Sequence, residues 1–184
     1  MARVKVAARA HVPPFAVMEI LAAANARRAA GEDVLNLCAG EPSTGASDVV
    51  RQRAIDLLTS GGGLGYTEAL GVPALRSAIA QHYRDRYDVT VDPRRVAVTT
   101  GSSGGFVLAF LAAFDVGDRV ALAVPGYPAY ANILAALGCE VVIVPCGPET
   151  RYQPTVAQLE AIDPPVEGLA VSYTHLTLPT ILLV

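Results

Sequence analysis

Alternation of strand-like and helix-like segments in the middle of the sequence constrains the fold more than any other feature. Apolar runs with strand character lie at residues 96–100, 120–124 and 140–144, and helix-like runs at 106–114 and 128–137 separate them. Such strand–helix–strand alternation is typical of a parallel sheet covered by helices. The run at 106–114 is apolar nearly all round, which predicts that this helix is buried. The sequence therefore predicts an α/β fold.

Capping and turn signals predict the other elements. Gly31 closes a helix-forming stretch, Ser47 can cap a second helix, Pro73 suits a first helical turn, and Thr155 with Gln158 fits a capping box. These signals predict helices over residues 15–30, from 47 to about 60, over 72–87 and over 155–161. Short strands are expected over residues 34–37 and 168–172.

A run of small residues, Gly-Ser-Ser-Gly-Gly at 101–105, joins the first strand-like segment of the series to its helix. Small residues at such a junction let backbone N–H groups approach a phosphate, and the positive end of the helix dipole favours its charge. The hydroxyls of Ser102 and Ser103 can add donors. Taken alone, the run also fits an ordinary tight turn.

An exposed aromatic residue, Tyr127, follows the next strand in the run Pro-Gly-Tyr-Pro at 125–128. A ring in that position can stack on a flat cofactor. Packing of Tyr127 in the core is the alternative, and Tyr130 can simply support the loop. The two features together favour an aromatic, phosphorylated cofactor.

Two further motifs in register with these features carry a family resemblance. They are Leu-Asn-Leu-Cys-Ala-Gly-Glu-Pro at 35–42 and Gly-Tyr-Thr-Glu-Ala-Leu-Gly-Val-Pro-Ala-Leu-Arg at 65–76. From about residue 12 to residue 171 the chain resembles the N-terminal part of the class I/II aminotransferases, which are fold-type I enzymes that use pyridoxal 5'-phosphate (PLP). The resemblance implies an incomplete large domain with three α/β/α layers and a mostly parallel sheet, preceded by an N-terminal arm and helix.

The resemblance also assigns cofactor-binding residues. It implies that Ser102, Ser103 and Gly104 surround the PLP phosphate and that Tyr127 lies on the pyridine ring. Tyr66 matches a tyrosine that reaches the phosphate held by the other subunit of a homodimer; without that partner it is a tyrosine of a surface loop. These assignments are expectations for the structure to test.

Gly40 matches the family's glycine whose backbone approaches the substrate α-carboxylate, although a glycine required only by the turn before Pro42 fits equally well. No residue of this chain is assigned a catalytic role. Lys5 is the only lysine among the 14 basic residues, and it stands outside every matching motif. The resemblance places the lysine that binds PLP covalently, an aspartate for the pyridine nitrogen and an arginine for the substrate carboxylate beyond the region covered here. The 184-residue chain is therefore expected to be a truncated, inactive form.

The composition changes abruptly at Tyr173. Residues 173–184 contain no Ala, Gly, Arg or Asp, in contrast to the preceding chain, and are expected to be a foreign tail. The expected organisation is an N-terminal arm and small-domain segment at 1–45, a partial PLP-binding domain at 46–172, and the tail. The family's first large-domain strand pairs with a late one, so residues 96–100 are expected to leave an aggregation-prone edge and poor solubility.

Charge and cysteine content narrow the function classes. The formal net charge is −3 and the basic residues are scattered, which argues against nucleic acid and anionic membrane partners. The cysteines Cys38, Cys139 and Cys146 are odd in number and lack metal-site spacing, and the three histidines are too far apart for a local metal motif. A cytoplasmic location is expected.

The function expected from the resemblance is PLP-dependent transfer of an amino group between an amino acid and a 2-oxo acid, by a homodimer when full length. A PLP-dependent β-lyase or decarboxylase of the same fold is an alternative, because reaction type depends on residues outside this region. A non-catalytic ligand-sensing domain, like the aminotransferase-like part of some transcription regulators, is another. It is disfavoured because no basic DNA-binding module precedes residue 13.

Overall fold

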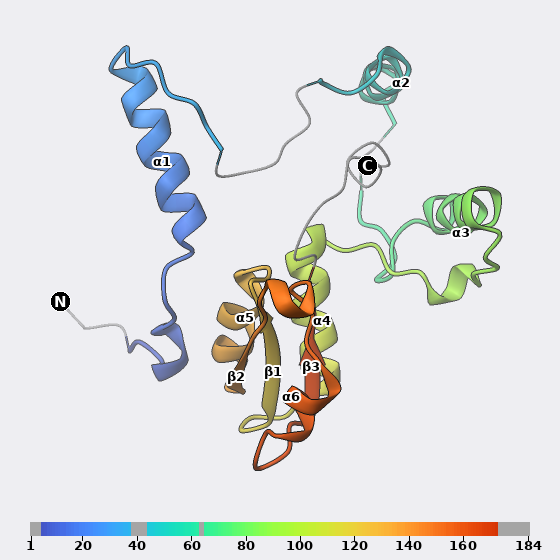
Figure 1. Ribbon diagram of the computed structural model, residues 1–184. Coiled ribbons are helices and arrows are strands. Elements are labelled where there is room, and N and C mark those ends of the chain that lie inside the picture. Colours follow the sequence, from blue (N-terminus) through green and yellow to red (C-terminus); the bar gives the residue numbers. More distant parts are fainter. Residues whose placement is uncertain (1–4, 38–43, 63–64, 173–184) are drawn as a thin grey trace. The chain divides into compact units, whose positions relative to one another are not determined.

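The computed structural model of the protein describes residues 5–37, 44–62 and 65–172 (Figure 1). The chain divides into two compact units, one formed by Met1–Ala22 with Gly101–Val184 and the other by Ala23–Thr100. The elements in chain order are η1 (Ala8–Ala10), α1 (Ala16–Ala29), α2 (Asp48–Thr59), α3 (Pro73–Tyr87), η2 (Pro93–Arg95), α4 (Gly101–Ala113), β1 (Arg119–Val124), α5 (Ala129–Leu137), β2 (Glu140–Pro145), η3 (Pro148–Thr150), α6 (Val156–Glu160) and β3 (Gly168–Ala170). The predicted tail at 173–184 lies outside the described residues, and the domain boundaries at 45 and 172 stay predictions.

The first unit is built on a parallel sheet in which β1 lies between β2 and β3 (Figure 1). All six residues of β1 pair in register with β2, from Arg119 opposite Glu140 to Val124 opposite Pro145. The pairing of β1 with β3 is also parallel. The predicted parallel sheet is therefore confirmed, as is the alternation of strands and helix from residue 119 to residue 145.

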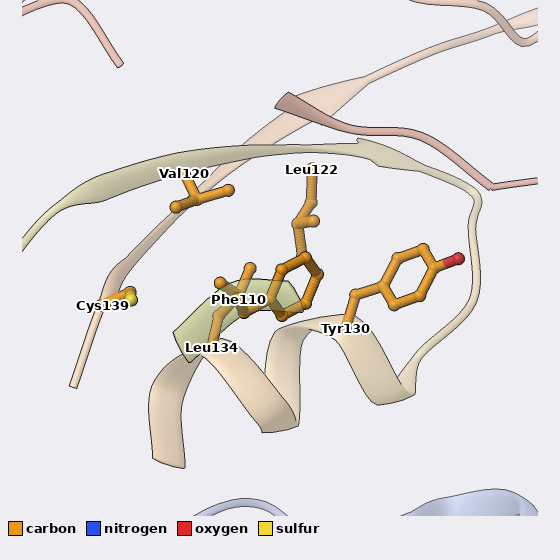
Figure 2. Packing of buried hydrophobic residues seen from close by; sticks show 6 residues of the cluster. All are labelled: Phe110, Val120, Leu122, Tyr130, Leu134 and Cys139. Carbon is orange, nitrogen blue, oxygen red and sulfur yellow. The ribbon is translucent and has the colours of Figure 1, made fainter. Parts of the chain in front are cut away.

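Alternation along β1 divides its side chains between two cores. Val120 and Leu122 point to one face, where they pack with Phe110 of α4 and with Tyr130 and Leu134 of α5 (Figure 2). On the other face, Ala121 and Ala123 of β1 pack with Val144 of β2 and with Cys146 just after it. Apolar residues of α6 and the following loop complete this core: Leu159, Ile162 and Val166. Helical segments thus cover both faces of the sheet, which is the expected three-layer α/β/α arrangement.

Arg119 holds the beginnings of the three strands together. Its Nε donates to Glu140 Oε1 at 3.0 Å, and its guanidinium also donates to the carbonyl oxygen of Pro164. Its backbone N–H donates to Glu167 Oε2 at 2.7 Å. The Arg119 side chain is 17% exposed, so these interactions are partly shielded from water and join β1, β2 and the segment leading into β3.

The second unit contains α2, α3 and η2, which are followed by residues 96–100. The strand predicted for residues 96–100 is absent from the structure. Val98 N–H donates to Leu70 O at 3.0 Å, and Arg76 Nε donates to Val96 O at 2.9 Å and Pro93 O at 3.1 Å. These bonds attach an extended segment to a loop and a helix. A strand requires repeated hydrogen bonding to a second extended backbone, and among the described residues no second backbone pairs with this segment in that way.

Three other predictions need correction. Residues 34–37 form no strand; Leu35 and Leu37 are 86% and 93% exposed, so their alternation does not pack against anything described. The helix predicted at 106–114 begins at Gly101, and it is not buried all round, because Leu108 and Leu111 are about 60% exposed. Ser47 precedes α2 but its side chain makes no capping hydrogen bond.

The other capping signals act as expected. Gly138 ends α5 in the left-handed region with φ of +88°, which glycine adopts without strain. Thr155 and Gln158 form both hydrogen bonds of the capping box at the start of α6. Within the described residues, no helix has the length and apolar character needed to cross a membrane.

Candidate cofactor site

The first turn of α4 contains the residues predicted to hold a phosphate. Gly101 opens the helix with φ of +74°, and a Cβ built on it would meet no atom within 4 Å. The backbone conformation, and not contact with neighbouring atoms, is therefore the reason for a glycine at this position. The space next to Gly101 is open. Ser102 and Ser103 are exposed, and in the part of the chain that the structure describes their hydroxyls make no hydrogen bond.

The electrostatics of this turn come from the backbone. The first N–H groups of an α-helix have no intrahelical acceptor, and they form the positive end of the helix dipole. No charged side chain occurs in residues 101–114 or 125–137. Amides and hydroxyls are thus the donors that α4 offers, which suits an anion that needs hydrogen bonds from several directions.

Tyr127 lies in the loop between β1 and α5. Its ring is half-buried and contacts two other rings edge to face: Phe15, with centroids 6.3 Å apart at 76°, and Tyr130, with centroids 5.3 Å apart at 80°. Gly126 permits this loop, because a Cβ at that position would lie 2.6 Å from the carbonyl oxygen of Ala123.

A chain of ring contacts connects the start of α4 with Tyr127. Ser102 and Phe106 are four residues apart and therefore share a face of α4. The rings of Phe106 and Tyr130 are 4.5 Å apart, and Tyr130 is only 8% exposed in the core next to Tyr127. In parallel α/β sheets, ligands bind outside the carboxyl ends of the strands, where the helices also begin. The α4 start and Tyr127 occupy that edge of the sheet.

The structure does not test the positions predicted for the other site residues relative to this edge. Tyr66 is fully exposed and belongs to the second unit, and its reach to the phosphate held by another subunit stays a prediction. Gly40 lies outside the described residues. Lys5 is exposed on the N-terminal arm.

One contact at the site, between the N-terminal arm and α5, was not predicted from the sequence. Asn132 Nδ2 donates to the carbonyl oxygen of Pro13 at 3.0 Å, next to the ring pair of Phe15 and Tyr127. These partners are more than 100 residues apart in sequence, and no local pattern of periodicity or capping encodes such a pairing. A proline-rich arm ending in an aromatic residue was the available signal.

Comparison with known proteins defines the class. The chain belongs to the family of class I and II aminotransferases, whose family model matches residues 32–175. Over 168 residues it is 57% identical to the valine–pyruvate aminotransferase of Mycobacterium tuberculosis, a match covering 91% of this chain and 43% of that enzyme. It is 32% identical over 151 residues to an aspartate aminotransferase of Thermotoga maritima, covering 82% of this chain and 40% of the relative.

Solved structures of aminotransferases support the same family assignment. A crystal structure of an aminotransferase from Mycobacterium tuberculosis matches with a TM-score of 0.84 and 57% identity, over 91% of this chain and 43% of that one. The aspartate aminotransferase of Thermus thermophilus with maleate matches with a TM-score of 0.81 and 29% identity, over 91% and 44%. The expected family and the fold-type I architecture are confirmed, and the chain spans less than half the length of the relatives it matches.

Proposed function

We propose that this chain is part of a PLP-dependent aminotransferase that moves an amino group from an amino acid to a 2-oxo acid. The observation that carries the proposal is the first turn of α4, where a left-handed glycine with open space around it precedes two exposed serines whose hydroxyls make no hydrogen bond to the residues that the structure describes. Family membership supplies the reaction class. A bound PLP would supply an electron sink that stabilises negative charge at the α-carbon of the amino acid, which is the chemistry that amino-group transfer requires.

The residues of α4 fit the phosphate group of PLP. Backbone N–H groups of the first turn, with the hydroxyls of Ser102 and Ser103, would donate to phosphate oxygens, and Gly104 would keep the approach free of side chains. A hydrogen bond to a charged group contributes about 1.5–3 kcal/mol, so several donors together give useful affinity without a cationic side chain. Tyr127 would cover the pyridine ring, since two neighbouring rings hold it at the same edge of the sheet.

Two residues complete the proposal at the level of the whole enzyme. Tyr66, which is fully exposed, would reach the phosphate held by a second subunit in a homodimer. Gly40 would bring its backbone to the substrate α-carboxylate. The name of the Mycobacterium tuberculosis relative supports valine and pyruvate as the substrate pair. We place this reaction in the cytoplasm as part of the same proposal.

The 184-residue chain itself is proposed to be inactive. Its single lysine, Lys5, is exposed on the arm and lies outside the residues matched by the family model. Borohydride treatment in the presence of PLP should therefore attach no stoichiometric amount of cofactor to the chain. Mass spectrometry of the treated protein tests this expectation, and one cofactor per chain on Lys5 would contradict it.

Titration with PLP tests the cofactor site directly. The double variant Ser102→Ala/Ser103→Ala removes two donors to a charged group and should weaken non-covalent PLP binding by about 100-fold or more, with inorganic phosphate competing less well. Ser60→Ala, which removes a serine hydroxyl at the end of α2, is the matched control. Equal PLP affinity of the double variant and the control would refute the phosphate assignment.

A chimaera tests the reaction. Residues 1–172 would replace the corresponding part of the Mycobacterium tuberculosis valine–pyruvate aminotransferase, and alanine formation from valine and pyruvate would be measured. Activity that is lost in the Ser102→Ala/Ser103→Ala chimaera supports the proposal. A folded chimaera that binds PLP but forms no alanine from any amino donor would contradict the assignment to amino-group transfer.

A further inference from the structure

The N-terminal arm ends at the ring that the proposed function assigns to the cofactor. Phe15, the residue immediately before α1, contacts Tyr127 edge to face with centroids 6.3 Å apart. Two residues earlier, the carbonyl oxygen of Pro13 accepts a hydrogen bond from Asn132 Nδ2 at 3.0 Å. The arm is thus fastened to α5, five residues beyond Tyr127, at the point where it meets the ring.

The two neighbours of Tyr127 differ in how firmly they are held. Tyr130 is 8% exposed and packs with Phe106 and Phe110 in the core, so its position is fixed by the sheet and two helices. Phe15 is half-buried and belongs to a segment outside that core. The orientation of the Tyr127 ring therefore depends on the core on one side and on the arm on the other.

We propose that Phe15, held by the Asn132–Pro13 hydrogen bond, is a positioning residue that orients Tyr127 for stacking on the cofactor ring. The inference rests on the proposed function, in which Tyr127 stacks on PLP. A Tyr127 ring that is already oriented before binding loses less conformational freedom when PLP binds, and the affinity for PLP is therefore higher. An edge-to-face ring pair of ordinary strength corresponds to a change of about two- to tenfold in affinity when it is lost.

The first measurement follows Tyr127 without any cofactor. The 184-residue chain is labelled with fluorotyrosine, and the Tyr127 resonance is identified by its loss in Tyr127→Phe. Phe15→Leu, which keeps apolar bulk but removes the ring, and Asn132→Asp, which removes the donor, should both shift the Tyr127 resonance. Phe15→Tyr should leave it near the wild-type position. Met18→Ala, an exposed residue of α1, is the control.

The second measurement is PLP affinity by titration of the same variants. Phe15→Leu and Asn132→Asp should each weaken PLP binding by about two- to tenfold. Phe15→Tyr, which keeps an aromatic ring, should bind PLP with an affinity close to that of the wild-type chain. A packing role alone predicts that leucine, which preserves apolar contact, substitutes for phenylalanine without loss. The rescue by tyrosine and the failure of leucine therefore separate positioning from packing.

The outcomes distinguish the inference from the function on which it rests. An unchanged Tyr127 resonance in Phe15→Leu and Asn132→Asp overturns the inference. So does a shifted resonance with unchanged PLP affinity, provided that Tyr127→Ala does weaken PLP binding. If Tyr127→Ala itself binds PLP like wild type, the assigned cofactor role of Tyr127 is wrong and the positioning role falls with it.

Discussion

Replacing Gly71 by alanine is expected to loosen the attachment of residues 96–100 to the loop before α3. Gly71 has φ of +92°, and a Cβ built on it would lie 2.7 Å from Val98 Cβ and 2.8 Å from Val98 Cγ2. The left-handed conformation costs an alanine about 1–2 kcal/mol. The overlap with Val98 adds the cost of displacing a well-placed neighbour, about 1–3 kcal/mol.

A matched glycine separates these two effects. Gly31, at the end of α1, has φ of +87°, and a Cβ built on it would meet no atom within 4 Å. Gly31→Ala should therefore show the conformational cost alone. The difference between the two variants should equal the overlap term, because the backbone strain is nearly the same in both.

Hydrogen exchange at the Val98 amide is the appropriate assay, since that N–H donates to Leu70 O at 3.0 Å across the contact. Gly71→Ala should accelerate exchange at Val98 by about 5- to 150-fold more than Gly31→Ala does. Comparable exchange rates in the two variants would show that Val98 yields without cost and would refute the argument from close approach.

Three further outcomes are expected. The pKa of Asp92 is lowered to about 2, chiefly by its side-chain hydrogen bonds with Arg94. Because this folded-state pKa lies below the unfolded value of 3.8, the ionised carboxylate stabilises the folded state fully above about pH 4. This stabilisation is lost as the pH falls through about 2. An NMR titration of the Asp92 carboxyl carbon should show this pKa rise toward 3.8 in Arg94→Gln, and an unchanged value would contradict the cause given. Thr155→Val removes the cap of α6 and should cost about 1 kcal/mol in urea denaturation, whereas Thr155→Ser should cost little; equal losses would exclude the capping box as the reason. Leu134 is fully buried, and Leu134→Ala should lower the free energy of unfolding by about 2–5 kcal/mol. Leu108 on α4 is 60% exposed, and Leu108→Ala should lower it by less than about 0.5 kcal/mol. Similar melting temperatures for these two variants would refute the core assignment.

Local signals in the sequence predicted the helices well and the strands unevenly. Thr155 with Gln158 marked the start of α6, because a capping box involves residues three apart and is visible in the sequence. The segments at 34–37 and 96–100 had the composition of strands, but a strand also needs a paired backbone, which no local pattern specifies. Burial of α4 was overestimated for a related reason: an apolar surface shows what a helix can bury, not what is present to cover it.

The candidate site was predictable in part. Ser102, Ser103 and Tyr127 were predicted from residue type, position and family resemblance; a parallel sheet explains why the start of α4 and Tyr127 share one edge, and their contacts with a cofactor stay predictions. The hydrogen bond from Asn132 to Pro13 was not predictable, because it joins residues 119 apart and depends on how the arm returns to α5. The reach of Tyr66 to the phosphate held by another subunit and the role of Gly40 remain predictions.

The interactions of Arg119 have a consequence for how this sheet can be altered. They secure the amino-terminal ends of the strands through Glu140, Glu167 and the Pro164 carbonyl. Among the described residues, the loop at the opposite end of β1 takes no part in these interactions, so libraries that vary residues 125, 127 and 128 and keep Gly126 should yield folded members more often than libraries that vary residues 163–167. The scaffold thus separates the part of the chain that tolerates redesign from the part that does not.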